Sequence, residues 1–281
     1  MALYEATDGD NWYNNTGWLT TSTPCSWYGV TCDERVAELR IDSNNLNGAL
    51  PAEISAFTTL WDLELGNNNL TTLPSEIGNL SALTLLDLSF NVLTVLPPEI
   101  GSLSTLTELR LQVNALTTLP PEIGNLSALT WLDLSGNALT ALPSEIGNLS
   151  ALTHLTLQGN TLTILPPEIG NLSALTRLDL SGNALTALPL EFWDLTALTS
   201  LGLSSNSLTT LPSEIGNLTG LTSLLLGGNN LATLPSEFWE LTALEHLGLD
   251  QNSLTALPPE IGNITGLTSL LLGGNNLATL P

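Results

Sequence analysis

The sequence predicts an α/β solenoid, in which short coils stack on one another and each contributes one strand to a parallel sheet. Three observations support this fold class. A unit such as LPPEIGNLSALTWLDLSGNALTA, residues 119–141, returns with few changes at a fixed interval. Within the unit, apolar residues alternate with outward positions over the few residues that a short strand needs. A proline recurs in each unit, and it favours an irregular or 3₁₀ segment over a full helix.

The period of the repeat is most easily followed from one asparagine. This residue lies at Asn44, Asn68, Asn91, Asn114, Asn137, Asn160, Asn183, Asn206, Asn229, Asn252 and Asn275. The first step is 24 residues and every later step is 23. The unit is the leucine-rich repeat motif L-x-x-L-x-L-x-x-N-x-L, whose tandem copies form horseshoe-shaped solenoids. We therefore expect an N-terminal cap over residues 1–35, about eleven repeats over residues 36–281 and no C-terminal cap.

Each part of the unit has an expected place in a coil. Leu132 and Leu134 point into the core, while Trp131 and Asp133 project from a concave strand. Asn137 is expected to be a buried amide that hydrogen-bonds the backbone of its own turn and of the adjacent coil. The LPPEIGN segment then turns the chain onto a convex side of irregular or 3₁₀ structure. At roughly 4.8 Å per strand, the parallel sheet extends about 50 Å.

The charge balance excludes several classes of function. The formal net charge is −23, the chain has no lysine, and its only strongly basic residues are Arg35, Arg40, Arg110 and Arg177. Nucleic acids and anionic membranes bind clustered positive charge, so neither is an expected partner. No apolar run is long enough to span a bilayer, so membrane insertion is not expected. The start, MALYEATDGD, has no basic or apolar leader, which indicates a mature or trimmed product.

Both cysteines lie in the segment TPCSWYGVTCDERV. Cys25 and Cys32 are close enough in sequence for a disulfide that closes a small loop, worth about 2.5 kcal/mol from chain entropy. A stapled, tryptophan-rich cap would cover the first hydrophobic edge of the solenoid. The alternative is a pair of reduced thiols in the cap.

The first segment, together with the LNGALP of the first repeat, resembles plant-type extracellular leucine-rich repeat proteins, which include receptor-kinase ectodomains and polygalacturonase-inhibiting proteins. The residues that carry the resemblance are Trp12, Trp18, Cys25, Trp27, Gly29, Val30 and Cys32. Similar caps occur in secreted bacterial and protist proteins. From Leu73 onwards, the LTxLPxEIGNL repeats are similar to the shorter type of many bacterial and intracellular proteins. The resemblance implies a binding solenoid that is secreted or displayed at the cell surface.

The copies differ mainly at the positions that project from the concave strands. We expect these positions to bind a protein or peptide partner, since chemical variety confined to one face is typical of a recognition surface. The candidate binding residues are Glu38, Arg40, Asp62, Glu64, Asp87, Glu108, Arg110, Trp131, Asp133, His154, Arg177 and Asp179. Neutral variation on a solvated face is the alternative interpretation.

The convex side repeats more strictly. One glutamate per coil forms a row that we interpret as solvated, because single carboxylates on successive coils lack the ligands of a Ca²⁺ site. Possible N-glycosylation sequons begin at Asn14, Asn69, Asn79, Asn125, Asn148, Asn171, Asn217 and Asn263. Two coils replace IGN by FWD and FWE. We expect Phe192 and Phe238 to fill the core, whereas Trp193 and Trp239, if they project outward, form a second adhesive site.

No catalytic, metal or cofactor site is expected. His154 and His246 are four coils apart, roughly 20 Å, so they cannot act as acid–base partners or share a metal ion. No motif pairs a nucleophile with a histidine base. The chain is therefore predicted to be a non-enzymatic extracellular binding or adhesion module.

Two other functions remain open at this point. An uncapped last coil ending in GGNNLATLP would expose leucines and a strand edge, which favours self-assembly into dimers, fibrils or a surface layer. Regular threonine rows, such as Thr94, Thr117 and Thr140, suggest an ice-binding solenoid, although threonine also suits turns and strand edges.

Overall fold

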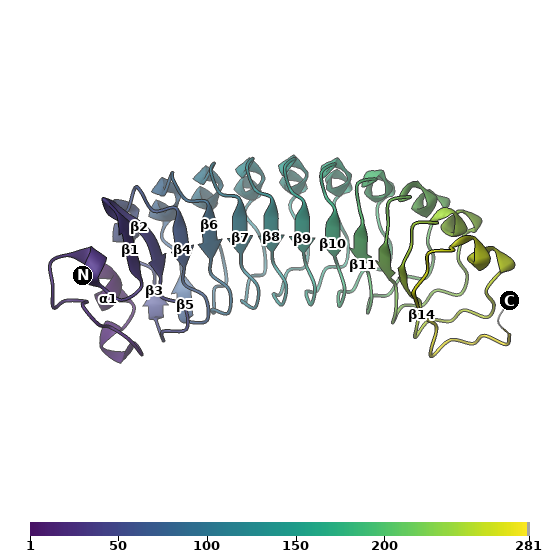
Figure 1. The fold of residues 1–281 in the computed structure, drawn as a ribbon, viewed down its shortest axis with the longest axis horizontal. Coiled ribbons are helices and arrows are strands. Elements are labelled where there is room, and N and C mark those ends of the chain that lie inside the picture. The colour runs from purple at the N-terminus through teal and green to yellow at the C-terminus, as the bar shows by residue number, and fades with distance from the viewer. Residues whose placement is uncertain (280–281) are drawn as a thin grey trace. The chain divides into compact units, whose positions relative to one another are not determined.

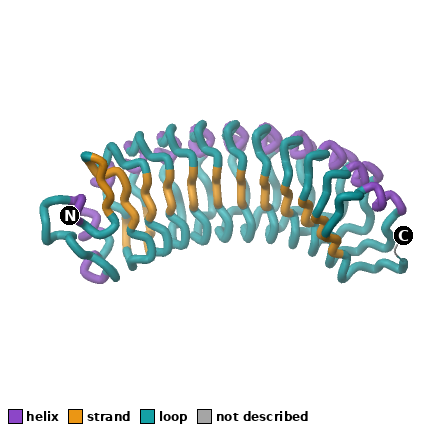
Figure 2. The backbone as a smooth tube through the Cα atoms, viewed as in Figure 1, coloured by secondary structure: helices purple, strands orange, loops and turns teal. Residues whose placement is uncertain are grey.

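The computed structural model describes residues 1–279, and the chain forms two compact units, Met1–Leu139 and Thr140–Pro281. Within each unit the strands lie side by side on one face and the 3₁₀ turns lie on the opposite face (Figures 1 and 2). We call these the strand face and the turn face; they are the faces predicted to be concave and convex. The last two residues of the predicted solenoid, Leu280 and Pro281, lie outside the described residues.

The sheet of the first unit runs in the order β1-β2-β4-β6-β7-β8. Its strands are β1 (Val30–Asp33), β2 (Arg35–Arg40), β4 (Asp62–Glu64), β6 (Leu85–Asp87), β7 (Glu108–Arg110) and β8 (Trp131–Asp133). β1 pairs antiparallel with β2 and the others pair in parallel. A small ribbon pairs β3 (Asn47–Ala49) with β5 (Asn69–Thr72). The helical segments are α1 (Ala2–Ala6), η1 (Gly9–Asn11), η2 (Pro24–Ser26), η3 (Ala52–Ala56), η4 (Ser75–Asn79), η5 (Pro98–Ser102) and η6 (Pro121–Asn125).

The second unit repeats the same coil. Its strands pair in parallel and are β9 (His154–Thr156), β10 (Arg177–Asp179), β11 (Ser200–Gly202), β12 (Ser223–Leu225), β13 (His246–Gly248) and β14 (Ser269–Leu271). Its 3₁₀ turns are η7 (Ser144–Asn148), η8 (Pro167–Asn171), η9 (Leu190–Asp194), η10 (Ser213–Asn217), η11 (Ser236–Glu240) and η12 (Pro259–Asn263).

The interior of each coil is built from leucines and one amide. Leu132 and Leu134 are fully buried, as the alternation predicted. The amide of Asn91 donates to the carbonyls of Leu65, in the preceding coil, and Leu88, at 3.0 and 3.1 Å. Its Oδ1 accepts the backbone N–H of Leu70 at 2.8 Å. Because a buried peptide group without a partner is costly, these bonds tie each coil to the one before it.

The turn face packs closely because glycine is found where successive turns meet. Proline opens η6, and the N–H of Ile123 donates to the carbonyl of Pro120 at 3.0 Å, a 3₁₀ bond. A Cβ placed on Gly101 of η5 would lie 2.2 Å from the carbonyl oxygen of Glu122 in the next turn. The short turns and the parallel sheet confirm the predicted solenoid.

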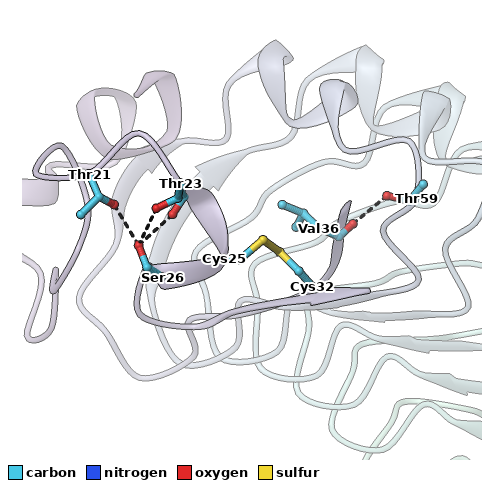
Figure 3. The surroundings of a disulfide bond; sticks show 7 residues. All are labelled: Thr21, Thr23, Cys25, Ser26, Cys32, Val36 and Thr59. Carbon is cyan, nitrogen blue, oxygen red and sulfur yellow. Dashed lines mark hydrogen bonds between the residues drawn. A yellow bond between two sulfur atoms is a disulfide. The ribbon is translucent and has the colours of Figure 1, made fainter. Parts of the chain in front are cut away.

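The N-terminal cap contains the predicted disulfide (Figure 3). Cys25 and Cys32 are bonded with an S–S distance of 2.08 Å, which excludes the alternative of reduced thiols in this structure. Elsewhere in the cap, the indole of Trp18 packs against those of Trp12 and Trp27, with ring centroids 5.0 and 4.6 Å apart. A stack of large rings gives the small cap a core of its own.

Trp193 and Trp239 do not project outward, so the condition for a second adhesive site at these residues is not met. Their exposed fractions are only 1 % and 5 %, and the neighbouring phenylalanines are buried as expected. Where glycine takes this position the next turn is very close: a Cβ on Gly170 would lie 2.1 Å from the carbonyl oxygen of Glu191. An indole cannot fit into such a close contact between two turns. At Trp193, space remains between its own coil and the following coil, and the indole lies there. There Trp193 lines a cavity of about 200 Å³ together with Leu211 of that coil.

Candidate binding surface

The predicted outward positions form two rows on the strand face of the first unit. The cross-strand register aligns Glu38, Asp62, Leu85, Glu108 and Trp131 in one row, and Arg40, Glu64, Asp87, Arg110 and Asp133 in the other. Neighbours in a row are one strand spacing apart, roughly 4.8 Å. These rows hold six carboxylates and two guanidinium groups, so this part of the face is acidic.

Arg40 is held by three carboxylates from two strands. Its Nε lies 3.1 Å from Asp62 Oδ2 and 3.1 Å from Glu64 Oε1, and its Nη2 lies 3.6 Å from Glu38 Oε2. Nη2 also donates to Asp62. Asp62 is only 1 % exposed, and its Oδ1 has no hydrogen-bond partner among residues 1–279. Arg40 therefore compensates the buried charge of Asp62. Because three carboxylates surround this one guanidinium group, the cluster keeps an excess of negative charge.

Glu64 lies in this cluster and is partly buried. Partial burial raises the pKa of the Glu64 carboxyl above its ordinary value, and the charge of Asp62 raises it further. Arg40 opposes the shift, while Asp42 and Asp87 add to it. A cation that approaches a carboxyl group in a cluster of like charge stabilises its charged form and lowers its pKa.

Arg110 forms a second ionic cluster, three strands along the sheet from Arg40. Its Nε lies 2.7 Å from Glu108 Oε1 and its Nη1 lies 3.3 Å from Asp87 Oδ2. The other oxygen of Asp87 accepts from the hydroxyl and backbone N–H of Ser89, at 2.6 and 2.9 Å. Asp87 is thus fixed in orientation, which gives this part of the surface a defined geometry.

Large aromatic side chains accompany these charges. Trp61 is 41 % exposed and Trp131 is 37 % exposed. Tryptophan is enriched among the anchors of protein interfaces, because it buries much apolar area and loses little conformational entropy. An exposed indole beside ordered ion pairs is an arrangement suited to recognition rather than to catalysis.

The second unit carries the remaining candidates. The register aligns His154 with Arg177 and Thr156 with Asp179. Nδ1 of His154 lies 2.9 Å from the hydroxyl of Thr153, and burial, followed by the charge of Arg177, lowers the pKa of His154. Asp179 Oδ1 accepts the backbone N–H of Ser181 at 2.9 Å. This unit therefore presents a neutral histidine beside an exposed arginine.

The sequence analysis missed two exposed apolar residues in the first unit, Phe90 and Val113. They are 50 % and 44 % exposed and directly precede Asn91, which is buried, and Asn114, which is half-buried. At this position the coils carry Ser43, Asn67, Phe90, Val113, Gly136, Gly159, Gly182, Ser205, Gly228, Gln251 and Gly274. In the sequence, the signal is that Phe and Val replace the small or polar residues that the other coils carry at this position.

Other classes of site are not found in the part of the chain that the structure describes. No group of three or more His, Cys, Asp or Glu residues in 1–279 is placed to hold a metal ion. Over the same residues, none of the helices has the length and apolar character needed to cross a bilayer. Asn14 of the predicted sequons is half-buried and the other seven are exposed, so glycosylation stays a prediction.

Comparison with known families matches almost the whole chain. The family described as "Leucine-rich repeat region" matches residues 108–184 and 191–279, and "Leucine rich repeat" matches residues 34–99 and 162–208. Residues 2–33 match "Leucine rich repeat N-terminal domain". A leucine-rich repeat receptor-like protein kinase of Arabidopsis thaliana, PXC2, is 45 % identical over 51 residues, which is 17 % of this chain and 5 % of that protein.

Solved structures with the same fold come from bacteria and plants. The Leptospira interrogans protein LIC12759 is 37 % identical with a TM-score of 0.65, over 88 % of this chain and 74 % of that one. The plant peptide hormone receptor RGFR1, in complex with RGF2, is 37 % identical with a TM-score of 0.78, over 87 % of this chain and 40 % of that one. The Arabidopsis thaliana receptor kinase ectodomain GASSHO1/SCHENGEN3, in complex with CASPARIAN STRIP INTEGRITY FACTOR 2, is 30 % identical with a TM-score of 0.70. It matches over 92 % of this chain and 41 % of its own.

Proposed function

Because the chain belongs to the leucine-rich repeat family, we propose that it is a non-enzymatic module that binds a protein or peptide partner through its strand face. The observation that carries the proposal is the contrast between the two faces of the first unit. The turn face repeats one glutamate in every turn and one glycine in η4, η5 and η6, whereas the strand face carries ordered ion pairs and two exposed tryptophans.

The relatives support the same class of function. The structures of RGFR1 and GASSHO1/SCHENGEN3 contain peptide or protein ligands, and this chain aligns with less than half of each. What those proteins bind is not transferred to this chain. The shared scaffold supports the class of function, a module that binds a protein or peptide, and the role of the candidate residues on the strand face is our own proposal.

We further propose that the module acts outside the cell, secreted or at the cell surface. A disulfide in a small cap suits an oxidising compartment, because cytosolic thiols are kept reduced. The match of residues 2–33 to the N-terminal domain of the family supports this placement.

A peptide selection tests the proposed function directly. Random peptides displayed on phage are selected on the immobilised full chain and then measured against Trp131→Ala and Arg177→Ala. Selected peptides are expected to bind at least one of these variants more weakly. The matched control, Glu99→Ala with Glu122→Ala on the turn face, should leave binding unchanged. No enrichment, or enrichment of peptides sensitive only to the control, would contradict the proposal.

The two other hypotheses stay predictions with their own measurements. Self-assembly predicts a molar mass that rises with concentration in light scattering. Ice binding predicts thermal hysteresis in the purified protein. Neither result is needed for binding of a partner on the strand face.

A further inference from the structure

The residue before the recurring asparagine of each repeat lies in the left-handed region of the backbone map. In the coils of residues 1–279, φ at this position runs from 51° at Phe90 and Gln251 to 71° at Gly274. Glycine enters this region without strain, and asparagine enters it with little. For a bulky or β-branched residue it is an outlier that the rest of the fold must support. Phe90, with φ of 51°, and Val113, with φ of 55°, are such outliers.

These two side chains do little for the core. About half of each is exposed, and the core of the same coils is filled by leucines and Asn91. The backbone at both positions is already satisfied: the N–H of Phe90 donates to Gln112 and that of Val113 to Ser135, each at 2.8 Å. Any residue with an N–H would make these bonds. Folding therefore explains neither the side chains nor the strain at these positions.

Phe90 and Val113 lie at equivalent positions of adjacent coils, one strand spacing apart, and we call them the apolar pair. A Cβ on Gly136, at the same position of the next coil, would lie 3.3 Å from Cγ2 of Val113. Side chains in this column are therefore within contact distance of their neighbours. Two exposed apolar groups side by side form the start of a docking surface.

The charge next to the apolar pair is negative on balance, because Arg110, three residues before Val113, is held by the two carboxylates of Asp87 and Glu108. Asp87 precedes Phe90 by three residues and is bonded to Ser89, the residue before Phe90. Across the strand pairing, Asp87 aligns with Glu64, whose pKa is raised by burial and by neighbouring carboxylates. A second copy of this chain, with a formal charge of −23, would be repelled from such a surface. A cationic partner would be attracted to it.

We propose that the apolar pair and the carboxylates of Glu64 and Asp87 form one docking site for an extended cationic peptide segment with an apolar side chain. The apolar side chain packs on Phe90 and Val113, and an arginine or lysine two residues away pairs with the half-buried Glu64, while the buried Asp87 adds negative charge. This inference rests on the proposed function and adds to it the chemistry of the partner.

The test uses three synthetic peptides of about ten residues, which extend to roughly 33 Å. One alternates Arg and Leu, the second alternates Arg and Ser, and the third alternates Glu and Leu; each carries fluorescein. Binding to the full chain is followed by fluorescence anisotropy. The Arg/Leu peptide is expected to bind, and the other two to bind at least about tenfold more weakly, since burial of one apolar side chain or one charge pair accounts for that much.

The matched variants are Phe90→Asn with Val113→Gly, which restore residues found at this position in other coils, and Ile164→Thr as a control at an exposed apolar residue of the second unit. The double variant should lose at least about tenfold in affinity for the Arg/Leu peptide and keep its affinity for the Arg/Ser peptide. Its melting temperature should stay within about 3 °C of the wild type, since strain relief offsets lost packing. The control should match the wild type in both measurements.

Three results overturn the inference. They are failure of the wild type to bind the Arg/Leu peptide at about 1 mM, unchanged affinity of the double variant, and a large fall in its melting temperature, which would give the pair a structural role. The phage selection separates this failure from that of the proposed function: selected peptides that bind the strand face but lack basic and apolar residues would refute only the partner chemistry.

Discussion

Replacement of Gly101 by alanine gives the sharpest test of how successive turns pack. The added Cβ would lie 2.2 Å from the carbonyl oxygen of Glu122, so the two turns must separate by about 1 Å to reach ordinary contact. Backbone shifts of this kind in packed regions cost about 1–3 kcal/mol, and alanine offsets up to about 1 kcal/mol through its helical propensity. The expected net loss is about 1–2 kcal/mol.

Gly262→Ala is the matched control, because nothing lies within 4 Å of its Cβ position and the residue lies in the equivalent segment of η12. This variant should be as stable as the wild type or slightly more stable. Urea titrations followed by far-ultraviolet circular dichroism give the unfolding midpoint of each variant. The midpoints are compared only if the dependence of unfolding free energy on urea concentration is the same, because stacked repeats can depart from two-state unfolding. Equal midpoints for the two variants would refute the close-contact explanation of the glycine.

Three further changes test other parts of the fold. Asn91→Ala removes bonds to Leu65 and Leu70 and should cost about 2–4 kcal/mol in urea unfolding, because buried peptide groups lose their partners; a loss below about 1 kcal/mol would mean that water replaces the amide. Arg40→Met should cost about 1–3 kcal/mol, since it leaves the buried carboxylate of Asp62 unpaired, and an unchanged urea midpoint would count against the ion pair. Glu64→Gln should raise the melting temperature at pH 7. The raised pKa of Glu64 means that the folded state binds its proton more tightly than the unfolded state, so this carboxyl lowers stability above its folded pKa. The gain should vanish below the ordinary pKa of glutamate, and a gain that persists there would contradict this origin.

Features set within one coil could be predicted from the sequence. The alternation around Trp131–Asp133 placed the strand, and the recurring asparagine indicated the buried amide, because both depend on local periodicity. The register also aligned the predicted rows, since every coil after the first has the same length, but Asp62 and Asp87 in these rows are buried rather than exposed.

Features that depend on the distance between coils could not be predicted. Whether Trp193 points outward is decided by the space left by the following turn, and nothing in the sequence of one coil specifies that space. The ion-pair partners of Arg40 could not be predicted from the sequence either. Glu64 lies directly opposite Arg40 in the register, yet the guanidinium also donates to Asp62, which lies diagonally across. Long side chains choose among several neighbours at similar distances, and burial of one carboxylate decides the choice.

The asparagine ladder also determines how the protein responds to a pulling force. Asn91 bonds only to its own coil and to the coil before it, so each coil is held by a nearly identical set of short-range bonds. A coil that detaches from the end of a unit under tension releases 23 residues, roughly 80 Å of extended chain. Extension should therefore proceed in equal steps at similar forces, one step per coil. Each stack would then act as a stepwise spring that yields without losing the coils that remain folded.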